Sequence, residues 1–202
     1  MIADRLAARH FTAQADLPED LAPVGLGALD AFLRNLLVTD GTVSRSLEAH
    51  TLCPVTVEPV EQSETVPPPA AAAHLQLAED ETCIRRRIVM RIAGPDPSVW
   101  AESYVVPRRV PIDFLRALRE NSQGIGGTLE QLRLESWREL LWFGIGSAPQ
   151  WPDAAPYTRT LRRAYLILIE RRPALLIAED FALAEQSGAF SMAGADSEAE
   201  GS

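Results

Sequence analysis

The stretch LLIAEDFAL, residues 175–183, has the pattern around which the rest of the sequence is interpreted. Side chains alternate between the two faces of a β-strand. The odd positions form an apolar stripe with one carboxylate in its middle: Leu175, Ile177, Glu179, Phe181 and Leu183. Burying a lone carboxylate is costly, so Glu179 requires a cation and hydrogen-bond donors, or it takes up a proton.

An earlier stretch, IRRRIVMRI at residues 84–92, offers the cation. Its even positions are apolar except for Arg86, whereas Arg85, Arg87 and Arg91 fall on the opposite face. We therefore expect Arg86 and Glu179 on the core side of one sheet. From these residues alone, a structural ion pair and a catalytic pair remain equally open.

The composition excludes several classes of function. The 202 residues, 47% of them hydrophobic, are enough for one globular domain with a real core. All 19 basic residues are arginines, which rules out a lysine Schiff base, a pyridoxal-phosphate anchor and a P-loop. The formal net charge of −9 argues against nonspecific binding to nucleic acid or to an anionic membrane.

Cysteine, histidine and targeting patterns indicate a cytoplasmic protein without a metal centre. Cys53 and Cys83 lie among apolar neighbours in predicted strands, so we expect reduced core residues. His10, His50 and His74 lack the spacing of metal ligands. No segment has the roughly 20 apolar residues of a membrane span, and the N-terminus has no signal pattern.

Two helix beginnings could bind an anion. Leucine and phenylalanine at i, i+3, i+4 and i+7 spacing predict an amphipathic helix over residues 29–37, which ends at Asp40-Gly41. Thr42 can cap a second helix that begins near Val43, and the glycines of residues 124–127 precede another. Helix N-termini present free N–H groups to a carboxylate; the alternatives are an ordinary cap and a flexible turn.

Strand and turn patterns predict an α+β fold with a single antiparallel sheet of about six strands. The predicted strands cover residues 53–64, 84–92, 99–106, 135–143, 159–169 and 173–183. Arg163 shares a strand face with Tyr165 and is a second candidate for a buried cation. A further helix is predicted over residues 111–120. The proline and alanine tract at 67–73 and the segment 144–156 are predicted to be loops.

The predicted domain covers residues 29–185. Residues 1–28 are interpreted as an N-terminal extension that contains a short helix. Residues 186–202 consist mainly of Ser, Gly, Ala and acidic residues. Such a segment cannot bury enough apolar surface to order itself, so it is interpreted as a disordered acidic tail.

Several ordered stretches resemble the chorismate pyruvate-lyase family, whose members make 4-hydroxybenzoate. They are LLVTDGTVSR at 36–45, RRIVM at 86–90, VVP at 105–107, IGGTL at 125–129 and LLIAEDF at 175–181. The resemblance covers roughly residues 29–184. It implies one antiparallel sheet with helices that enclose a buried ligand pocket.

The resemblance also implies roles for the residues already singled out. Arg86 would hold the ring carboxylate, helped by backbone amides at Val43 and Ile125, with Gly126 and Arg163 as further substrate-binding residues. Glu179 would face the hydroxyl end of the ring as general acid or base. Loss of the C4 proton and the enolpyruvyl ether of chorismate gives an aromatic ring, so the implied reaction requires neither a metal nor an organic cofactor.

Some positions depart from the family pattern and leave the substrate open. No basic residue follows Tyr165, Asp180 adds a charge beside Glu179, and Ala182 and Leu183 stand where a proline is frequent. One alternative is a family member that acts on another cyclic carboxylic acid in secondary metabolism. Another is a binding module similar to the UTRA effector domains of transcription regulators. Those usually follow a DNA-binding domain, for which residues 1–28 leave no room.

Overall fold

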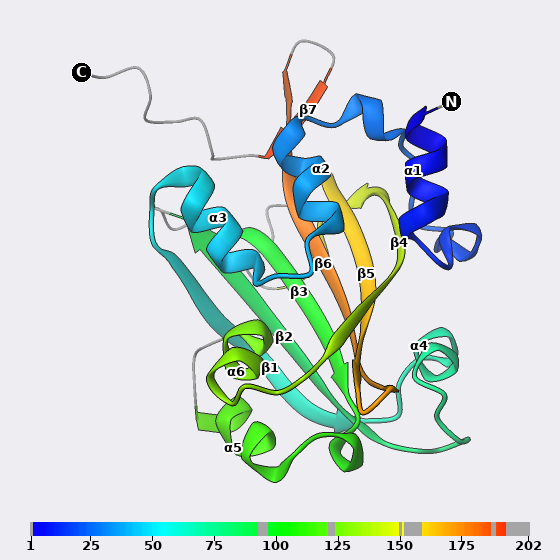
Figure 1. Ribbon diagram of the computed structural model, residues 1–202, viewed down its shortest axis with the longest axis vertical. Coiled ribbons are helices and arrows are strands. Elements are labelled where there is room, and N and C mark those ends of the chain that lie inside the picture. Colours follow the sequence, from blue (N-terminus) through cyan, green and yellow to red (C-terminus); the bar gives the residue numbers. More distant parts are fainter. Residues whose placement is uncertain are drawn as a thin grey trace.

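One antiparallel sheet organises the molecule. The computed structural model describes residues 2–92, 97–120, 124–149, 151, 159–186 and 189–192. The sheet has seven strands in the order β1-β2-β3-β6-β5-β4, with β7 paired to β6 (Figure 1). The strands are β1 Val55–Thr65, β2 Cys83–Ile92, β3 Pro97–Val105, β4 Trp137–Ser147, β5 Arg159–Ile169, β6 Arg172–Gln186 and β7 Ala189–Met192. The predicted α+β fold with a single antiparallel sheet is confirmed.

Helices cover both faces of this sheet. They are α1 Ile2–His10, α2 Ala31–Val38, α3 Val43–Thr51, α4 Pro69–His74, α5 Ile112–Glu120 and α6 Ile125–Gln131, with short 3-10 turns at Gln14–Asp16, Leu26–Ala28 and Pro107–Arg109. Helices α2, α3, α5 and α6 pack on one face, and α4 contributes to the apolar cluster on the other. No helix within the described ranges combines the length and apolar character needed to cross a membrane.

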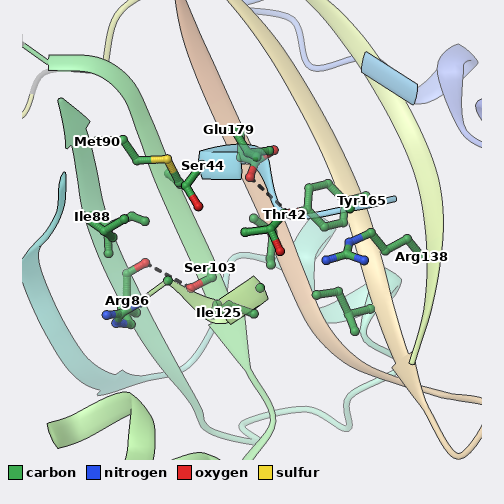
Figure 2. Close-up of a pocket in the computed structure, with 18 residues that line it drawn as sticks. Thr42, Ser44, Arg86, Ile88, Met90, Ser103, Ile125, Arg138, Tyr165 and Glu179 are labelled. Atoms are coloured by element: carbon green, nitrogen blue, oxygen red, sulfur yellow. Dashed lines mark hydrogen bonds between the residues drawn. The ribbon is translucent and has the colours of Figure 1, made fainter. Parts of the chain in front are cut away.

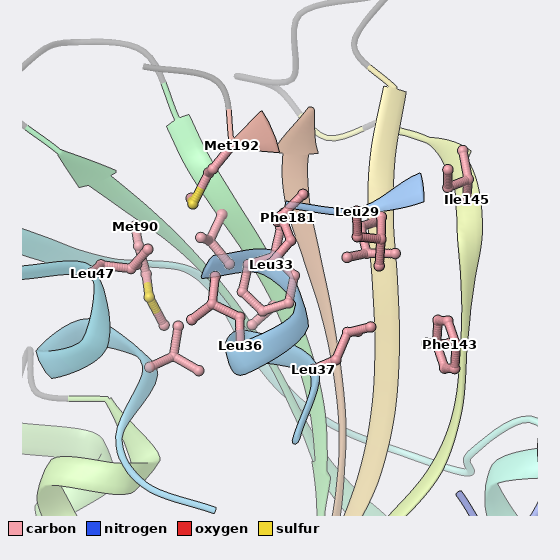
Figure 3. Packing of buried hydrophobic residues seen from close by; sticks show 14 of the residues in the cluster. Leu29, Leu33, Leu36, Leu37, Leu47, Met90, Phe143, Ile145, Phe181 and Met192 are labelled. Atoms are coloured by element: carbon pink, nitrogen blue, oxygen red, sulfur yellow. The ribbon is translucent and has the colours of Figure 1, made fainter. Parts of the chain in front are cut away.

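The largest apolar cluster fixes α2 against the sheet (Figure 3). Leu33, Leu36 and Leu37 are fully buried, and Phe181 of β6 lies in the same cluster. Burial of each such side chain contributes about 1.5–3 kcal/mol. Asp30 begins the helix because its Oδ1 accepts a hydrogen bond from the Leu33 N–H at 2.7 Å. The predicted amphipathic helix is therefore present, two residues later than its predicted start.

The proline and alanine tract is a helix and not the predicted loop. Pro69 occupies the first turn of α4, where a missing N–H costs nothing because that N–H would have no helical partner. The Pro68 carbonyl accepts a hydrogen bond from the Ala72 N–H at 2.9 Å. Alanine has the highest helix propensity, and Ala71 is buried against the sheet.

The segment interpreted as an N-terminal extension belongs to the domain. The Thr12 and Ala13 N–H groups donate to carbonyls of β4 at 2.9 Å, at Leu140 and Leu141. The Gln14 side chain donates to the Phe143 carbonyl at 2.8 Å and accepts from the Phe143 N–H at 3.0 Å. This segment therefore pairs the edge of β4, which would otherwise be exposed.

The close approach of this segment depends on glycines in β4. A side chain at Gly146 would place its Cβ 2.5 Å from Leu21 Cδ2, and one at Gly144 would lie 3.0 Å from the Ala22 carbonyl oxygen. Ala22 and Ile145 exchange backbone hydrogen bonds of 2.7 and 2.8 Å. As a result, β4 extends to Ser147, into the predicted loop 144–156, of which residues 150 and 152–156 lie outside the described part.

The C-terminal segment is also ordered in part, contrary to the prediction of a disordered tail over 186–202. Ala189–Met192 forms β7, whose Met192 is buried in the main apolar cluster. The Phe190 carbonyl accepts a hydrogen bond from the Asp30 N–H at 3.0 Å. Met192 and the half-buried Phe190 pack on this cluster, and β7 also pairs with β6. Residues 187–188 and 193–202 lie outside the described part.

Candidate functional site

The register of the sheet brings the predicted polar residues to one face. Arg86 of β2 lies opposite Ser103 of β3, Ser103 lies opposite Ile177 of β6, and Ile177 lies opposite Tyr165 of β5. In the neighbouring row, Glu179 lies opposite Ala101 on one side and Arg163 on the other. Arg86 and Glu179 therefore share the face on which α2, α3, α5 and α6 pack.

A pocket lies between this face and the beginnings of α3 and α6 (Figure 2). The space between its walls measures about 540 Å³, including part of the solvent at its mouth. The sheet side is mostly apolar. The polar and charged side chains that line it are Thr42, Ser44, Arg86, Ser103, Arg138, Tyr165 and Glu179.

Arg86 carries a buried positive charge for which the described part of the chain supplies no counter-ion. The residue is 1% exposed, and its Nε and Nη2 atoms find no hydrogen-bond partner among the described residues. Burial lowers the pKa of Arg86 from its ordinary value. Nearly all buried donors in folded proteins are paired, and leaving a charged one unpaired is costly. An anion in the pocket would remove that cost.

Glu179 pairs with Arg163 and not with Arg86. Its Oε2 accepts a hydrogen bond from Arg163 Nε at 2.8 Å, and its Oε1 accepts one from the Tyr165 hydroxyl at 3.2 Å. Adjacent strands place Arg163 and Glu179 directly opposite each other. Arg86 is two strands and two residues away, roughly 12 Å between α-carbons from standard strand spacings. The expectation that Arg86 supplies the cation for Glu179 is therefore wrong, and the alternative of a structural Arg86–Glu179 ion pair is excluded.

Arg163 lies behind Glu179 and is not among the residues that line the pocket. It is fully buried, and its Nη1 donates to the carbonyls of Leu36, Leu37 and Thr39, the last two at 3.2 Å. Only its Nη2 lacks a partner among the described residues. The expectation that Arg163 contacts the substrate is therefore replaced by a role in holding Glu179 and the end of α2.

Tyr165 is a functional candidate that the sequence analysis did not identify. Burial, followed by the negative charge of Glu179, raises the pKa of Tyr165 well above its ordinary value. The phenol therefore stays neutral and donates its hydrogen bond to Glu179. Glu179 is thus held by two donors at the edge of the pocket, at 4% exposure.

The beginnings of α3 and α6 close the pocket opposite the sheet. Neither helix has a side-chain cap: Thr42 and Gly124 precede their first residues without accepting from them through a side chain. Val43, Ile125 and Gly126 all line the pocket, and their contact with a ligand stays a prediction. A Cβ at Gly126 would lie 3.0 Å from Thr42 Oγ1 and 3.1 Å from Thr42 Cγ2, so glycine permits the two helix ends to meet.

Arg138 of β4 is a second pocket arginine that the sequence analysis missed. A β-bulge lies between Leu140 and Trp142 and shifts the alternation of side chains along the strand. The predicted face of Trp137, Leu141 and Phe143 is therefore wrong, and Trp137 is 72% exposed. Only the bulge, which has no clear sequence signal, turns Arg138 toward the pocket.

Asp180 does not add a charge to the pocket, because it points to the opposite face of the sheet. It accepts from the Thr160 hydroxyl at 2.8 Å and from Arg162 Nε at 2.8 and 2.9 Å. Burial raises the pKa of Asp180, and Arg162 and Thr160 oppose that shift. In the described part of the chain, no group of three or more His, Cys, Asp or Glu side chains is placed to hold a metal ion.

Several solved structures are similar to this chain in fold. The effector domain of PhnF from Mycobacterium smegmatis aligns with a TM-score of 0.54 at 10% identity, covering 70% of this chain and 88% of that one. PhnF itself aligns with a TM-score of 0.55 at 11% identity, over 72% of this chain and 65% of PhnF. The possible transcriptional regulator YydK from Bacillus subtilis subsp. subtilis str. 168 aligns at 0.49 and 18% identity, over 63% of this chain and 58% of YydK.

The two PhnF alignments show a shared fold and nothing further. The chain spans less than two thirds of the length of PhnF and of YydK. No curated protein matches the sequence. A family model described as chorismate pyruvate-lyase Rv2949c-like matches residues 37–187, which include both helix beginnings, Arg86 and Glu179. The chain belongs to the chorismate pyruvate-lyase Rv2949c-like family.

Proposed function

We propose that this protein is a lyase that converts chorismate to 4-hydroxybenzoate and pyruvate. The observation that carries the proposal is the buried, unpaired guanidinium of Arg86 in a pocket that also contains Glu179. An unpaired cation in an apolar pocket attracts an organic anion, and the membership of the family makes a ring carboxylate the natural candidate.

In the proposed complex, the ring carboxylate lies on Arg86 and receives further hydrogen bonds from the uncapped beginnings of α3 and α6. The N–H groups at Val43 and Ile125 would donate to it. The ring would extend along the apolar sheet residues Ile88 and Ile177 toward Glu179. A ligand that fills the pocket would displace water from it, which would strengthen these charged contacts.

Glu179 is the proposed proton-transfer group. As a base it would take the proton from C4 of the ring while the bond between the ring and the ether oxygen breaks. The electrons of the C–H bond complete the aromatic ring, and the ether oxygen leaves on the enolpyruvyl fragment. That fragment takes up a proton, which Glu179 can return, and becomes pyruvate. Arg163 and Tyr165 hold the carboxylate in one orientation throughout.

Aromatisation supplies the driving force, so the protein's task is to position one substrate and move one proton.

A pure binding function is the second candidate, because the same fold occurs in the effector domain of PhnF. The two candidates share the anion site at Arg86 and differ in the role of Glu179. A binding module would not need a proton-transfer group there.

The deciding experiment follows pyruvate release from chorismate by purified protein. We expect pyruvate release above the spontaneous rate. In Glu179→Gln, the rate of release should fall by about 100-fold or more, because general acid–base catalysis contributes about 10²–10⁴-fold. The matched control is Glu170→Gln, which removes an exposed carboxylate in the turn between β5 and β6. Binding of 4-hydroxybenzoate without any pyruvate release would instead favour the binding module.

A further inference from the structure

Arg138 lies in the pocket without a task in the mechanism above. Its Nε atom is buried and finds no partner among the described residues, and no carboxylate there forms an ion pair with it. Its Nη1 donates to the Asp40 carbonyl, and its Cζ lies 6.0 Å from the centroid of the Tyr165 ring. These contacts hold the guanidinium in place and leave its charge uncompensated.

The two pocket arginines are far apart. Arg86 belongs to β2 and Arg138 to β4, and β3, β6 and β5 lie between these strands. In Figure 2, the two guanidinium groups appear on opposite sides of the pocket, with Thr42 between them. A small acid with one carboxylate bound to Arg86 would therefore leave Arg138 unpaired.

The charges that line the pocket favour a ligand with more than one negative charge. Arg86 and Arg138 are the cations that line it, and Glu179 is the anion. Arg163 already neutralises Glu179 through their ion pair. Two positive charges therefore remain for a ligand, in a protein whose formal net charge is −9.

We propose that Arg138 is a specificity-determining residue that binds a second carboxylate of the ligand, on a side arm of the ring. This inference rests on the proposed function for the position of the first carboxylate at Arg86. The pocket then selects cyclic dicarboxylates over monocarboxylates. After a side arm is lost as a separate acid, the product keeps only the contact at Arg86 and binds more weakly.

Two stable aromatic acids test this inference without any catalysis. 3-Methoxybenzoate carries only the ring carboxylate, and 3-(carboxymethoxy)benzoate adds a second carboxylate on an arm at the same position. We expect calorimetric titration at neutral pH to show the diacid binding about tenfold or more tightly, the range of a hydrogen bond between charged groups. In Arg138→Gln, this preference should disappear while the affinity for 3-methoxybenzoate changes less than about threefold.

Two further variants make the result specific. Arg138→Lys keeps the charge and should keep part of the preference for the diacid, whereas Arg86→Gln should weaken the binding of both acids. Retained binding of 3-methoxybenzoate shows that Arg138→Gln is folded. The inference is overturned if the wild-type protein does not prefer the diacid, or if Arg138→Gln keeps the preference. If neither acid binds to the wild-type protein, both the anion site at Arg86 and the second site at Arg138 are wrong. If both acids bind equally well, only the site at Arg138 is wrong and the proposed lyase function stands.

Discussion

Arg163 and Glu179 form a buried ion pair on the face of the sheet that α2 covers. Arg163 Nε lies 2.8 Å from Glu179 Oε2, and the two side chains are 0% and 5% exposed. The pair occupies directly opposite positions on adjacent strands. Because Arg163 satisfies Glu179, Arg86 is left free for a ligand. The same pair holds Glu179 in one orientation, which a proton-transfer group requires.

Breaking this pair should strongly destabilise the fold. In Arg163→Met, Glu179 would be a buried carboxylate without its cation, and the carbonyls at the end of α2 would lose their donor. We expect the free energy of unfolding to fall by about 3–5 kcal/mol in urea denaturation. Arg163→Met combined with Glu179→Gln should recover part of this loss. The control is Arg116→Gln, which removes an exposed arginine of α5. If Arg163→Met is as stable as this control, the Arg163–Glu179 ion pair does not stabilise the fold.

Arg86→Gln, in contrast to Arg163→Met, should leave the stability of the fold intact while it removes the anion site. The wild-type guanidinium is buried without a counter-ion, so a neutral side chain removes a desolvation cost. We expect the free energy of unfolding to stay unchanged or rise by about 1 kcal/mol, within the usual range for a single substitution. Binding of 4-hydroxybenzoate should be lost in the same variant. If Arg86→Gln instead unfolds the protein as Arg163→Met does, Arg86 has a structural role that the contacts do not reveal.

The two cysteines should differ in reactivity. Burial, followed by the charges of Glu64 and Glu81, raises the pKa of the Cys83 thiol to about 11, whereas Cys53 is half-buried. Only the thiolate reacts with thiol reagents, so the folded protein should show one accessible thiol near neutral pH and two after unfolding. The contribution of Cys83 to stability is present below pH 9 and is lost as the pH rises toward 11. Rapid modification of both cysteines in the folded protein would be inconsistent with this burial.

Strand periodicity in the sequence was sufficient to place Arg86 and Glu179 on one face, because alternation is a local property. It could not identify the partner of Glu179, since that depends on which strands are neighbours. Long-range pairing places β3 between β2 and β6 and puts β5 beside β6. Arg163 was recognised as a buried cation, but its place opposite Glu179 follows only from the register.

Other errors in the sequence analysis have local causes. The bulge in β4 reverses the face of Arg138 relative to the residues after Leu140, and nothing in the sequence fixes its position. Residues 12–22 have the sequence character of a loop, because several of their polar atoms pair with the edge of β4 and not within a long helix or strand of their own. The predicted loop at 67–73 is α4 instead, because the alanines after Pro69 favour a helix and a proline is accommodated in its first turn.

Gly126 should control access to the pocket, because it lies where the beginnings of α3 and α6 meet. In Gly126→Ala, the added methyl group would press on Thr42 from 3.0 Å and force the two helix ends apart. Overpacking of this kind costs about 1–3 kcal/mol, and we expect weaker binding of 4-hydroxybenzoate in calorimetry together with reduced stability. Gly25→Ala is the control, since its Cβ would meet no atom within 4 Å. Thr42→Ala removes both atoms that the new methyl group would strike, so Gly126→Ala combined with Thr42→Ala should regain binding. If the double variant binds no better than Gly126→Ala, contact between these two residues is not what shapes the pocket.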